Sequence, residues 1–476
     1  MHAEHSLAIF TDNLFPGYCG QIRVDEPQIV ALAQHANRDL KAEAGRAYDV
    51  LSPRAEMELQ GALSRLLLRL LLFNAHYEVL QRAARSWVDA QRDFLIRLNL
   101  DHEQLQRAFE GADPKCRLEH LEIDLSDRHN GGRTVAALSF ASGLKVVYKP
   151  RDVGIENWYF DFLRWLNSSG LPIPLRTFKV LPKAGYGWVE FIPHVRCANK
   201  QAIAQYYRNA GAVLCVLHLL RASDCHFQNL IACGPSPVLI DAEMLFQPRL
   251  PGESEFISVR RTGMIPHWNR DPAPHGYDLS ALGCVAPKAT PFYVPTSTAE
   301  GVRLLPAVLR PETNVPFPIR GTVEPEAYVP DMISGFREVY RFGASHRREL
   351  LTQLENVVNT RVRYTLRDTL EYYQALTEML RSGVTAEAVL GPLPPARAGL
   401  STLRPDETSS LEQLDIPRFT LASASRDLGG VKNCLAASGY ELAVQGIEGL
   451  SDKDLQQQEA FIQLAWSLFR VSRSLS

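Results

Sequence analysis

Apolar side chains recur at helical spacing over residues 52–109, with charged residues between them. The repeating apolar positions are Leu59, Leu63, Leu66, Leu67 and Leu70. Steps of three and four residues bring these leucines to one face of a helix, while Arg65 and Arg69 point elsewhere. The segment is therefore predicted to be an amphipathic scaffold helix.

The hydrophobic period changes after this helical region. Residues 134–150, TVAALSFASGLKVVYKP, contain two β-rich runs joined by Ala-Ser-Gly. This pattern predicts a hairpin with Gly143 at its turn. Further short strands are predicted at residues 178–181 and 187–192.

Helical patterns alternate with these strands. Residues 157–167 place Trp158, Phe162 and Trp165 at the spacing of one buried helix face, and residues 201–221 form a long, mostly apolar helical run. A brief buried strand is predicted at residues 238–241. The order of hairpin, helix, strands, helix and strand predicts an α+β protein with a small β-rich lobe and a larger helical lobe.

The C-terminal half begins with a proline-rich region. Nine prolines lie between Pro287 and Pro330, which excludes long helices and central strands there and predicts an irregular excursion over the surface. A helical pattern is predicted for residues 332–381, a loop-like stretch for 391–417, and a final helix for 452–470.

Composition narrows the class of protein. The chain has 51 Lys and Arg against 53 Asp and Glu, a formal charge of −2, which gives no support for nucleic-acid binding. Its eight cysteines are scattered without a Cys-x-x-Cys pair, which argues against structural zinc. No signal peptide is recognisable, and the apolar run 66–73 is too short for a membrane span. We therefore predict a cytoplasmic protein with no membrane span.

The stretch ASDCHFQNLIACGPSPVLIDAE carries the strongest chemical signal. Asp224, His226 and Asn229 follow the end of a helix, and an apolar strand then leads to Asp241 and Glu243. Phosphoryl transfer needs this layout: one carboxylate serves the acceptor hydroxyl, and an amide oxygen and a second carboxylate hold Mg²⁺. The spacing predicts a kinase-like site.

A lysine on a strand strengthens this prediction. Lys149 stands at the end of the second hairpin strand, 75 residues before Asp224, where a kinase-like small lobe places the lysine that grips nucleotide phosphates. Glu156, on the following helix, is a candidate to orient it. Glu190, in GWVEFI, either lines the nucleotide cleft or points outward from its strand. Neither a Walker loop nor a protein-kinase glycine loop is present, which favours an atypical or lipid-kinase-like core.

Two further polar clusters have alternative interpretations. Asp127 and His129, in SDRHNGGR, belong either to the site or to an exposed polar turn. The segment RVRYTLRDT is predicted to be helical, which would put Arg363 and Arg367 on one face near Thr369. Such an arginine pair either binds a phosphate or forms a solvated basic face.

These motifs together resemble a known family. The runs GGRTVAALSFASGLKVVYKPR, YGWVEFI, ASDCHFQNLIACGPSPVLIDAE and RVRYTLRDTLEYY are similar to the dehydratase domain of class II lanthipeptide synthetases over about residues 83–376. The resemblance implies a lipid-kinase-like catalytic core elaborated by helical regions. On this basis we predict a helical cap (1–110), a catalytic core (111–385) and a C-terminal extension (386–476).

The resemblance also implies a two-step reaction on a ribosomal precursor peptide with a leader. ATP and Mg²⁺ serve to phosphorylate a Ser or Thr, and elimination of phosphate then gives dehydroalanine or dehydrobutyrine. By motif position, the resemblance implies that Lys149 binds the ATP phosphates, that Asp224 serves the acceptor hydroxyl and that His226 belongs to the same catalytic loop. It implies that Asn229 and Asp241 hold Mg²⁺ and that Glu243 supports the metal and lysine region. Arg363 and Thr369 match positions tied to phosphate elimination, and Asp127 and His129 match residues at the mouth of the site.

The chain also departs from the family. A full synthetase continues into a zinc-containing cyclase where this sequence reaches Ser476. We therefore expect no zinc and no ring formation by this chain alone, and a separate cyclase protein as a further partner. Two alternatives stay open: a kinase that stops at the phosphorylated product or acts on another hydroxyl acceptor, and a non-catalytic synthetase remnant that binds the precursor peptide.

Overall fold

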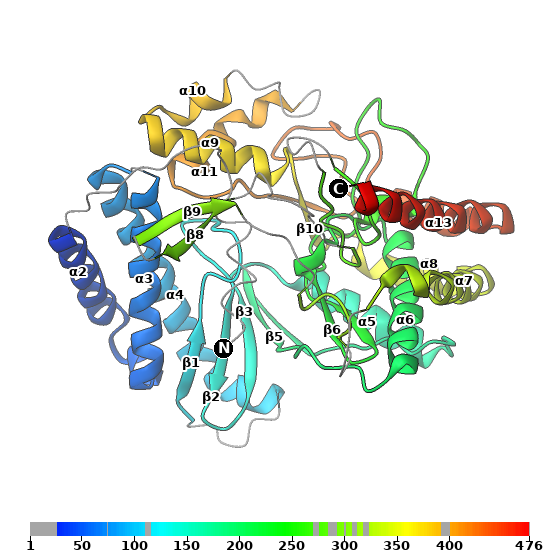
Figure 1. The fold of residues 1–476 in the computed structure, drawn as a ribbon, viewed down its shortest axis with the longest axis horizontal. Coiled ribbons are helices and arrows are strands. Elements are labelled where there is room, and N and C mark those ends of the chain that lie inside the picture. The colour runs from blue at the N-terminus through cyan, green and yellow to red at the C-terminus, as the bar shows by residue number, and fades with distance from the viewer. Residues whose placement is uncertain are drawn as a thin grey trace.

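A five-stranded antiparallel sheet stands between two groups of helices (Figure 1). The computed structural model describes residues 26–73, 75–109, 116–269, 276–283, 293–298, 301–306, 312–317, 323–391 and 400–475. The sheet order is β1-β2-β3-β5-β4, formed by β1 Leu118–Glu122, β2 Ala136–Phe140, β3 Lys145–Lys149, β4 Val180–Lys183 and β5 Tyr186–Glu190. The predicted hairpin is β2–β3, and Gly143 at its turn has a φ of 87°.

Three helices cover one side of the sheet: α2 Glu26–Ala44, α3 Pro53–Leu72 and α4 Tyr77–Ala108. Helix α3 begins at Pro53 because the Ser52 side chain accepts a hydrogen bond from the Ala55 amide, and proline suits the first helical position. Its buried face contains all five leucines predicted above. These helices and the sheet residues Val146, Tyr148 and Trp188 form one core.

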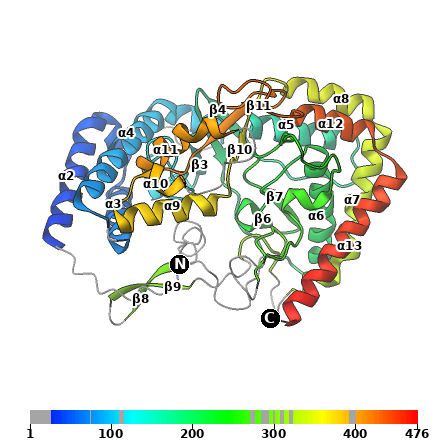
Figure 2. The same cartoon turned by 90° about the horizontal axis from the view of Figure 1, so that it is seen from above.

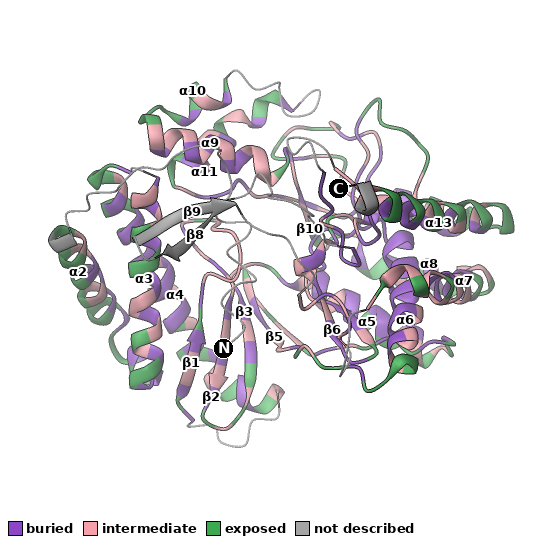
Figure 3. Cartoon of the chain, in the orientation of Figure 1, coloured by how far each residue is buried: buried purple, intermediate pink, exposed green. Residues whose placement is uncertain are grey.

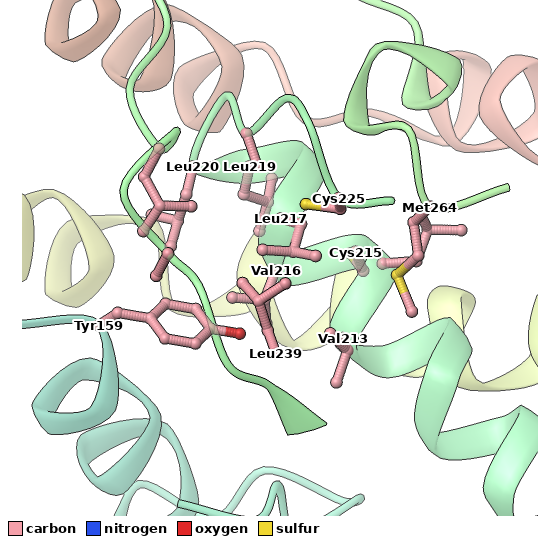
Figure 4. Packing of buried hydrophobic residues seen from close by; sticks show 14 of the residues in the cluster. Tyr159, Val213, Cys215, Val216, Leu217, Leu219, Leu220, Cys225, Leu239 and Met264 are labelled. Carbon is pink, nitrogen blue, oxygen red and sulfur yellow. The ribbon is translucent and has the colours of Figure 1, made fainter. Parts of the chain in front are cut away.

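The opposite group of helices forms a second core around α6 Lys200–Leu219 (Figures 2 and 3). Its other helices are α5 Gly154–Ser168, α7 Val329–Ser345, α8 Arg347–Leu354, α12 Gly439–Glu448 and α13 Asp452–Leu475. Figure 4 shows Val216 and Leu217 of α6 beside Tyr159 of α5, and Cys225 of the loop after α6 in the same cluster. Apolar packing thus fixes the start of the loop that carries Asp224.

Smaller elements complete the described chain. Three two-stranded sheets pair β6 Leu230–Cys233 with β7 Ser236–Leu239, β8 Tyr293–Thr298 with β9 Gly301–Pro306, and β10 Arg361–Tyr364 with β11 Phe419–Ala422. Helices α9 Thr369–Ser382, α10 Ala386–Leu390 and α11 Arg404–Glu412 share a third core. Short 3₁₀ helices lie at Gly45–Val50, Phe227–Asn229, Val259–Thr262, Pro325–Tyr328, Glu355–Val357 and Ser401–Leu403.

Most predicted elements and the α+β class are confirmed. The lipid-kinase-like core and the three domain boundaries stay predictions. None of the helices in the described residues is long and apolar enough to cross a membrane. Trp158, Phe162 and Trp165 do stack along one face of α5, but only Phe162 is fully buried.

Three predictions about secondary structure were wrong. Residues 361–364 form strand β10 and not a helix, because they pair with β11. The stretch 391–417 contains α11, which a pattern with few apolar residues concealed. The proline-rich region is not wholly irregular, because it contains the hairpin β8–β9. These two strands pair only with each other, so neither is a central strand and Pro295 is tolerated; other residues of that region lie outside the described part of the chain.

Helices α6 and α7 approach closely at two glycines. A Cβ on Gly211 would lie 1.8 Å from the Met332 carbonyl oxygen, and one on Gly335 would lie 1.8 Å from the Arg208 carbonyl oxygen. Both obstacles are helix backbone and not flexible side chains, so a methyl group would force the helices apart.

We predict that Gly211→Ala lowers the free energy of unfolding by about 2–3 kcal/mol, because overpacking of a rigid contact costs about this much. Chemical denaturation measures the change. Gly446→Ala is the matched control: a methyl group added to this α12 glycine would meet nothing within 4 Å, so the substitution should be neutral or slightly stabilising. Equal effects at the two positions would contradict the prediction.

Candidate active site

The Glu243 carboxylate contacts three arginines from separate segments. Its Oε2 lies 2.9 Å from Arg151 Nε and 2.7 Å from Arg418 Nη2, and its Oε1 lies 2.8 Å from Arg363 Nη1. Burial would raise the pKa of this carboxyl, but the three guanidinium groups hold it well below its ordinary value. Glu243 is therefore an anionic centre in the folded protein.

Arg151 extends this network to the strand lysine. Its Nη2 lies 2.8 Å from Asp241 Oδ1 and 2.5 Å from Glu156 Oε1. Lys149 Nζ donates to the same Glu156 oxygen over 3.3 Å and to the Ile240 carbonyl over 2.6 Å. Burial lowers the Arg151 pKa, yet the surrounding carboxylates raise it well above its usual value. The pairing of Lys149 with Glu156 is confirmed.

The loop after α6 brings Asp224, His226 and Asn229 beside Asp241. Asp224 has a φ of 61°, a left-handed conformation that is costly outside glycine and concentrates at functional sites. The Asn229 side-chain amide donates to the Asp224 carbonyl over 2.9 Å, and the Ile240 amide donates to the Asn229 carbonyl over 2.9 Å. These bonds hold the loop next to the residue before Asp241.

Electrostatics link this loop to the arginines. Burial raises the pKa of the Asp224 carboxyl, and the opposing charges of His226 and Arg363 reduce the effect. Burial also raises the pKa of Asp127, against the hydrogen bond from the Tyr373 hydroxyl and the charges of Arg363 and His226. Asp127 and Asp224 thus both interact with Arg363 and His226.

The segment with Asp127 and His129 is held by the C-terminal part of the chain. His129 Nδ1 lies 2.7 Å from the Ile416 carbonyl oxygen, which can only accept, so this nitrogen carries the proton. Burial and the charge of Arg363 lower the pKa of His129 to about 3. The interpretation as a mere exposed turn is wrong, because both side chains are partly buried and Tyr373 closes over Asp127.

Arg363 and Arg367 do not form the predicted pair. Arg363 lies on β10 and contacts Glu243, whereas Arg367 lies beyond the strand, where its Nε donates to the buried Glu407 over 2.8 Å. The prediction of a shared helix face was wrong because the pairing with β11 imposes an extended backbone on residues 361–364.

Two other predicted residues lie at the margin of the network. Thr369 is the first residue of α9, and Tyr373 lies four positions later on the same helix face. No described contact joins Thr369 to Asp127 or to the arginines, so its predicted role stays a prediction. Glu190, at the end of β5, accepts a hydrogen bond from the Lys179 amide over 3.0 Å. Its predicted place in a nucleotide cleft stays a prediction.

The donor set is compatible with Mg²⁺. Asn229 offers an amide oxygen and Asp241 a carboxylate that is 28% exposed, and Mg²⁺ prefers one or two such oxygens together with substrate phosphates. In the described parts of the chain, no three His, Cys, Asp or Glu side chains group to hold a metal by themselves. A magnesium ion shared with a nucleotide fits the residues better than a closed protein site.

Sequence reasoning missed three residues of this site: Arg151, Arg418 and Tyr373. Arg151 stands directly after the Lys-Pro pair that ends the hairpin, so its position next to Lys149 was a usable signal. Arg418 and Tyr373 gave none, because their partners lie 175 and 246 residues away in the chain. Arg418 and Arg363 each leave a buried Nε without a hydrogen-bond partner.

Comparison with known proteins places the site residues inside a matched region. A family model described as "Domain of unknown function (DUF4135)" matches residues 77–422. The lacticin 481/lactococcin biosynthesis protein LcnDR2 of Lactococcus lactis subsp. lactis is 26% identical over 324 residues, which cover 62% of this chain and 35% of that protein. The chain thus spans about a third of the relative's length. These matches confirm the resemblance predicted from the motifs.

We predict that His129 makes the protein acid-sensitive below pH 6.5. A histidine whose pKa falls from 6.5 to about 3 on folding must stay neutral, so its stabilising contribution is complete above pH 6.5 and is lost as the pH falls toward 3. Relative to His129→Asn, the free energy of unfolding of the wild type should drop by up to about 1.4 kcal/mol per pH unit in this range. Urea denaturation at pH 7 and pH 5 measures it; parallel profiles for the two proteins would contradict the prediction.

Proposed function

The chain belongs to the DUF4135 family, and on that premise we propose that it dehydrates Ser and Thr residues of a ribosomally made precursor peptide in lanthipeptide biosynthesis. The similarity to a lacticin 481/lactococcin biosynthesis protein supports this class of substrate. The observation that carries the proposal is the single ion network that joins Lys149, Asp241 and Glu243 to Arg363. One site thus combines groups for phosphoryl transfer with a cation for phosphate departure.

The first proposed step is phosphoryl transfer. Lys149, held by Glu156, binds the nucleotide phosphates. Asp224 accepts the proton of the peptide hydroxyl while the oxygen of that hydroxyl attacks the γ-phosphorus. Mg²⁺, held by Asn229 and Asp241, neutralises charge on the transferred group when it is bound. ADP is the leaving group, and we propose a lipid-kinase-like core for this part of the chain.

The second proposed step is elimination. A base of the site removes the α-proton, the Cα–Cβ double bond forms, and the bond from Cβ to the phosphate oxygen breaks. The phosphate leaves as a dianion, for which Arg363 is the proposed partner with Arg418 beside it. Both arginines already bind a carboxylate here, so the site supplies cations at the place where negative charge is released.

Reconstitution tests the proposal. The full chain is incubated with ATP, Mg²⁺ and the precursor peptide encoded beside it, and the peptide mass is measured. Loss of water from Ser or Thr supports the proposal. A stable phosphate adduct indicates a peptide kinase that stops after the first step, and an unchanged peptide contradicts both functions. Addition of a separate cyclase protein tests the proposed partner.

We predict that Arg363→Ala uncouples the two steps. Phosphorylated peptide should accumulate, and the dehydration rate should fall about 100-fold or more, because a buried cation that stabilises the leaving group is lost. Arg361→Ala is the matched control: this exposed arginine of the same strand contacts Thr420 and not Glu243. Mass spectrometry of the peptide over time follows both species. Normal dehydration by Arg363→Ala would refute the role of this arginine.

A further inference from the structure

A second group of arginines lies outside the network around Glu243. Arg221, Arg249 and Arg261, here called the arginine cluster, meet around residues 247–249. The Arg221 carbonyl accepts a hydrogen bond from the Gln247 amide over 3.1 Å, and Arg261 Nη2 donates to the Pro248 carbonyl over 3.0 Å. The cluster therefore brings together the end of α6, the segment after Glu243 and the short helix at Val259–Thr262.

Arg221 is the unusual member. It is 4% exposed, its backbone has a φ of 57°, and its buried Nε has no hydrogen-bond partner. No carboxylate in the described residues forms an ion pair with it. Burying an arginine without an anion is strongly destabilising. A buried guanidinium without an ion pair at this position thus indicates an unfilled interaction.

The described contacts of Arg249 bring little negative charge to Arg221. The described carboxylate contact of Arg249 is to Glu255 over 2.9 Å, but the Glu255 side chain is 87% exposed, so the pair is weak. Arg249 Nε is also buried without a partner. Burial is the main cause that lowers the pKa of Arg221 to about 9, and the positive charges of Arg261 and Arg249 lower it further. The positive charges of Arg249 and Arg261 therefore act on Arg221, and no carboxylate of the described residues pairs with Arg221 itself.

We infer that the arginine cluster is an oxyanion site that takes a phosphate group. Guanidinium groups bind phosphate oxygens in pairs of parallel hydrogen bonds, and a dianion would neutralise the buried positive charge of Arg221. Access is available beside Arg249, whose side chain is 17% exposed and is followed by the exposed residues 251–256. The phosphate is either free in solution or carried by a phosphorylated side chain of this chain.

The position of the cluster links it to the candidate active site. Gln247, whose amide binds the Arg221 carbonyl, also donates from Nε2 to the Arg363 carbonyl over 2.8 Å. The Ser223 amide, between Arg221 and Asp224, donates to the Met244 carbonyl over 3.0 Å. A phosphate at the cluster would therefore hold the loop of Asp224 and the strand of Arg363 through the same short segment.

Phosphate binding tests the inference without any enzymatic assay, so its failure is distinct from failure of the proposed function. The full chain is dialysed free of phosphate and sulfate, and inorganic phosphate is titrated at constant ionic strength while Tm and binding heat are measured. We expect a saturable rise in Tm that chloride does not produce. Arg249→Gln should weaken phosphate binding about 10-fold or more and raise Tm in phosphate-free buffer, because a repulsive charge is removed.

Control variants locate the site. Arg208→Gln removes an arginine of α6 that is paired with Glu338 and should keep the phosphate response. Arg261→Gln is a second cluster variant and should lose it. A response in Arg249→Gln and Arg261→Gln equal to that of the wild type would overturn the inference.

Intact mass distinguishes the two sources of phosphate. A chain without covalent phosphate that responds to the titration supports a site for free phosphate. A chain that carries one phosphoryl group as purified and ignores added phosphate supports the covalent source, provided that Arg249→Gln lowers the Tm of that phosphorylated form. A chain that neither carries a phosphoryl group nor responds to phosphate overturns the inference.

Discussion

The buried ion pairs of Glu243 are the interaction on which the arrangement of the site depends. Arg151 follows strand β3, Arg363 lies on β10, and Arg418 precedes β11, yet all three meet one carboxylate. Removing charges from water is expensive, and only close mutual contact repays the cost. The five-stranded sheet, the helical part and the strand pair β10–β11 must therefore hold one relative position, since displacement of any of them would leave a buried arginine unpaired.

This constraint also explains the electrostatic character of the site. Glu243 cannot neutralise three arginines, and Asp241 and Glu156 share Arg151 with it. Arg363 also lies among the carboxylates of Asp224 and Asp127, and its charge acts against the burial that raises the pKa of Asp224. The carboxylates of the site thus lie close to positively charged side chains.

Local patterns predicted most of the fold, and long-range pairing decided the rest. Ser52, Gly143 and the leucines of α3 specify their elements within a few residues, so the sequence alone sufficed for them. Residues 361–364 did not specify their strand in this way, although the burial of Arg-Val-Arg-Tyr alternates as it does in a strand. Four residues are too short to separate a strand from a helix by period, and the partner strand β11 arrives only at Phe419.

The same distinction separates the predicted site residues from the missed ones. Asp224, Asn229 and Asp241 stand within one short motif, whereas Arg418 becomes meaningful only when folding brings it to Glu243. The near-neutral charge of −2 conceals this, because composition averages over places that folding separates. Arginines gather at Glu243 and again at Arg221, on the two sides of Gln247. Since charge acts over short distances in a protein, these local groups and not the total charge determine the electrostatic surroundings of each part of the chain.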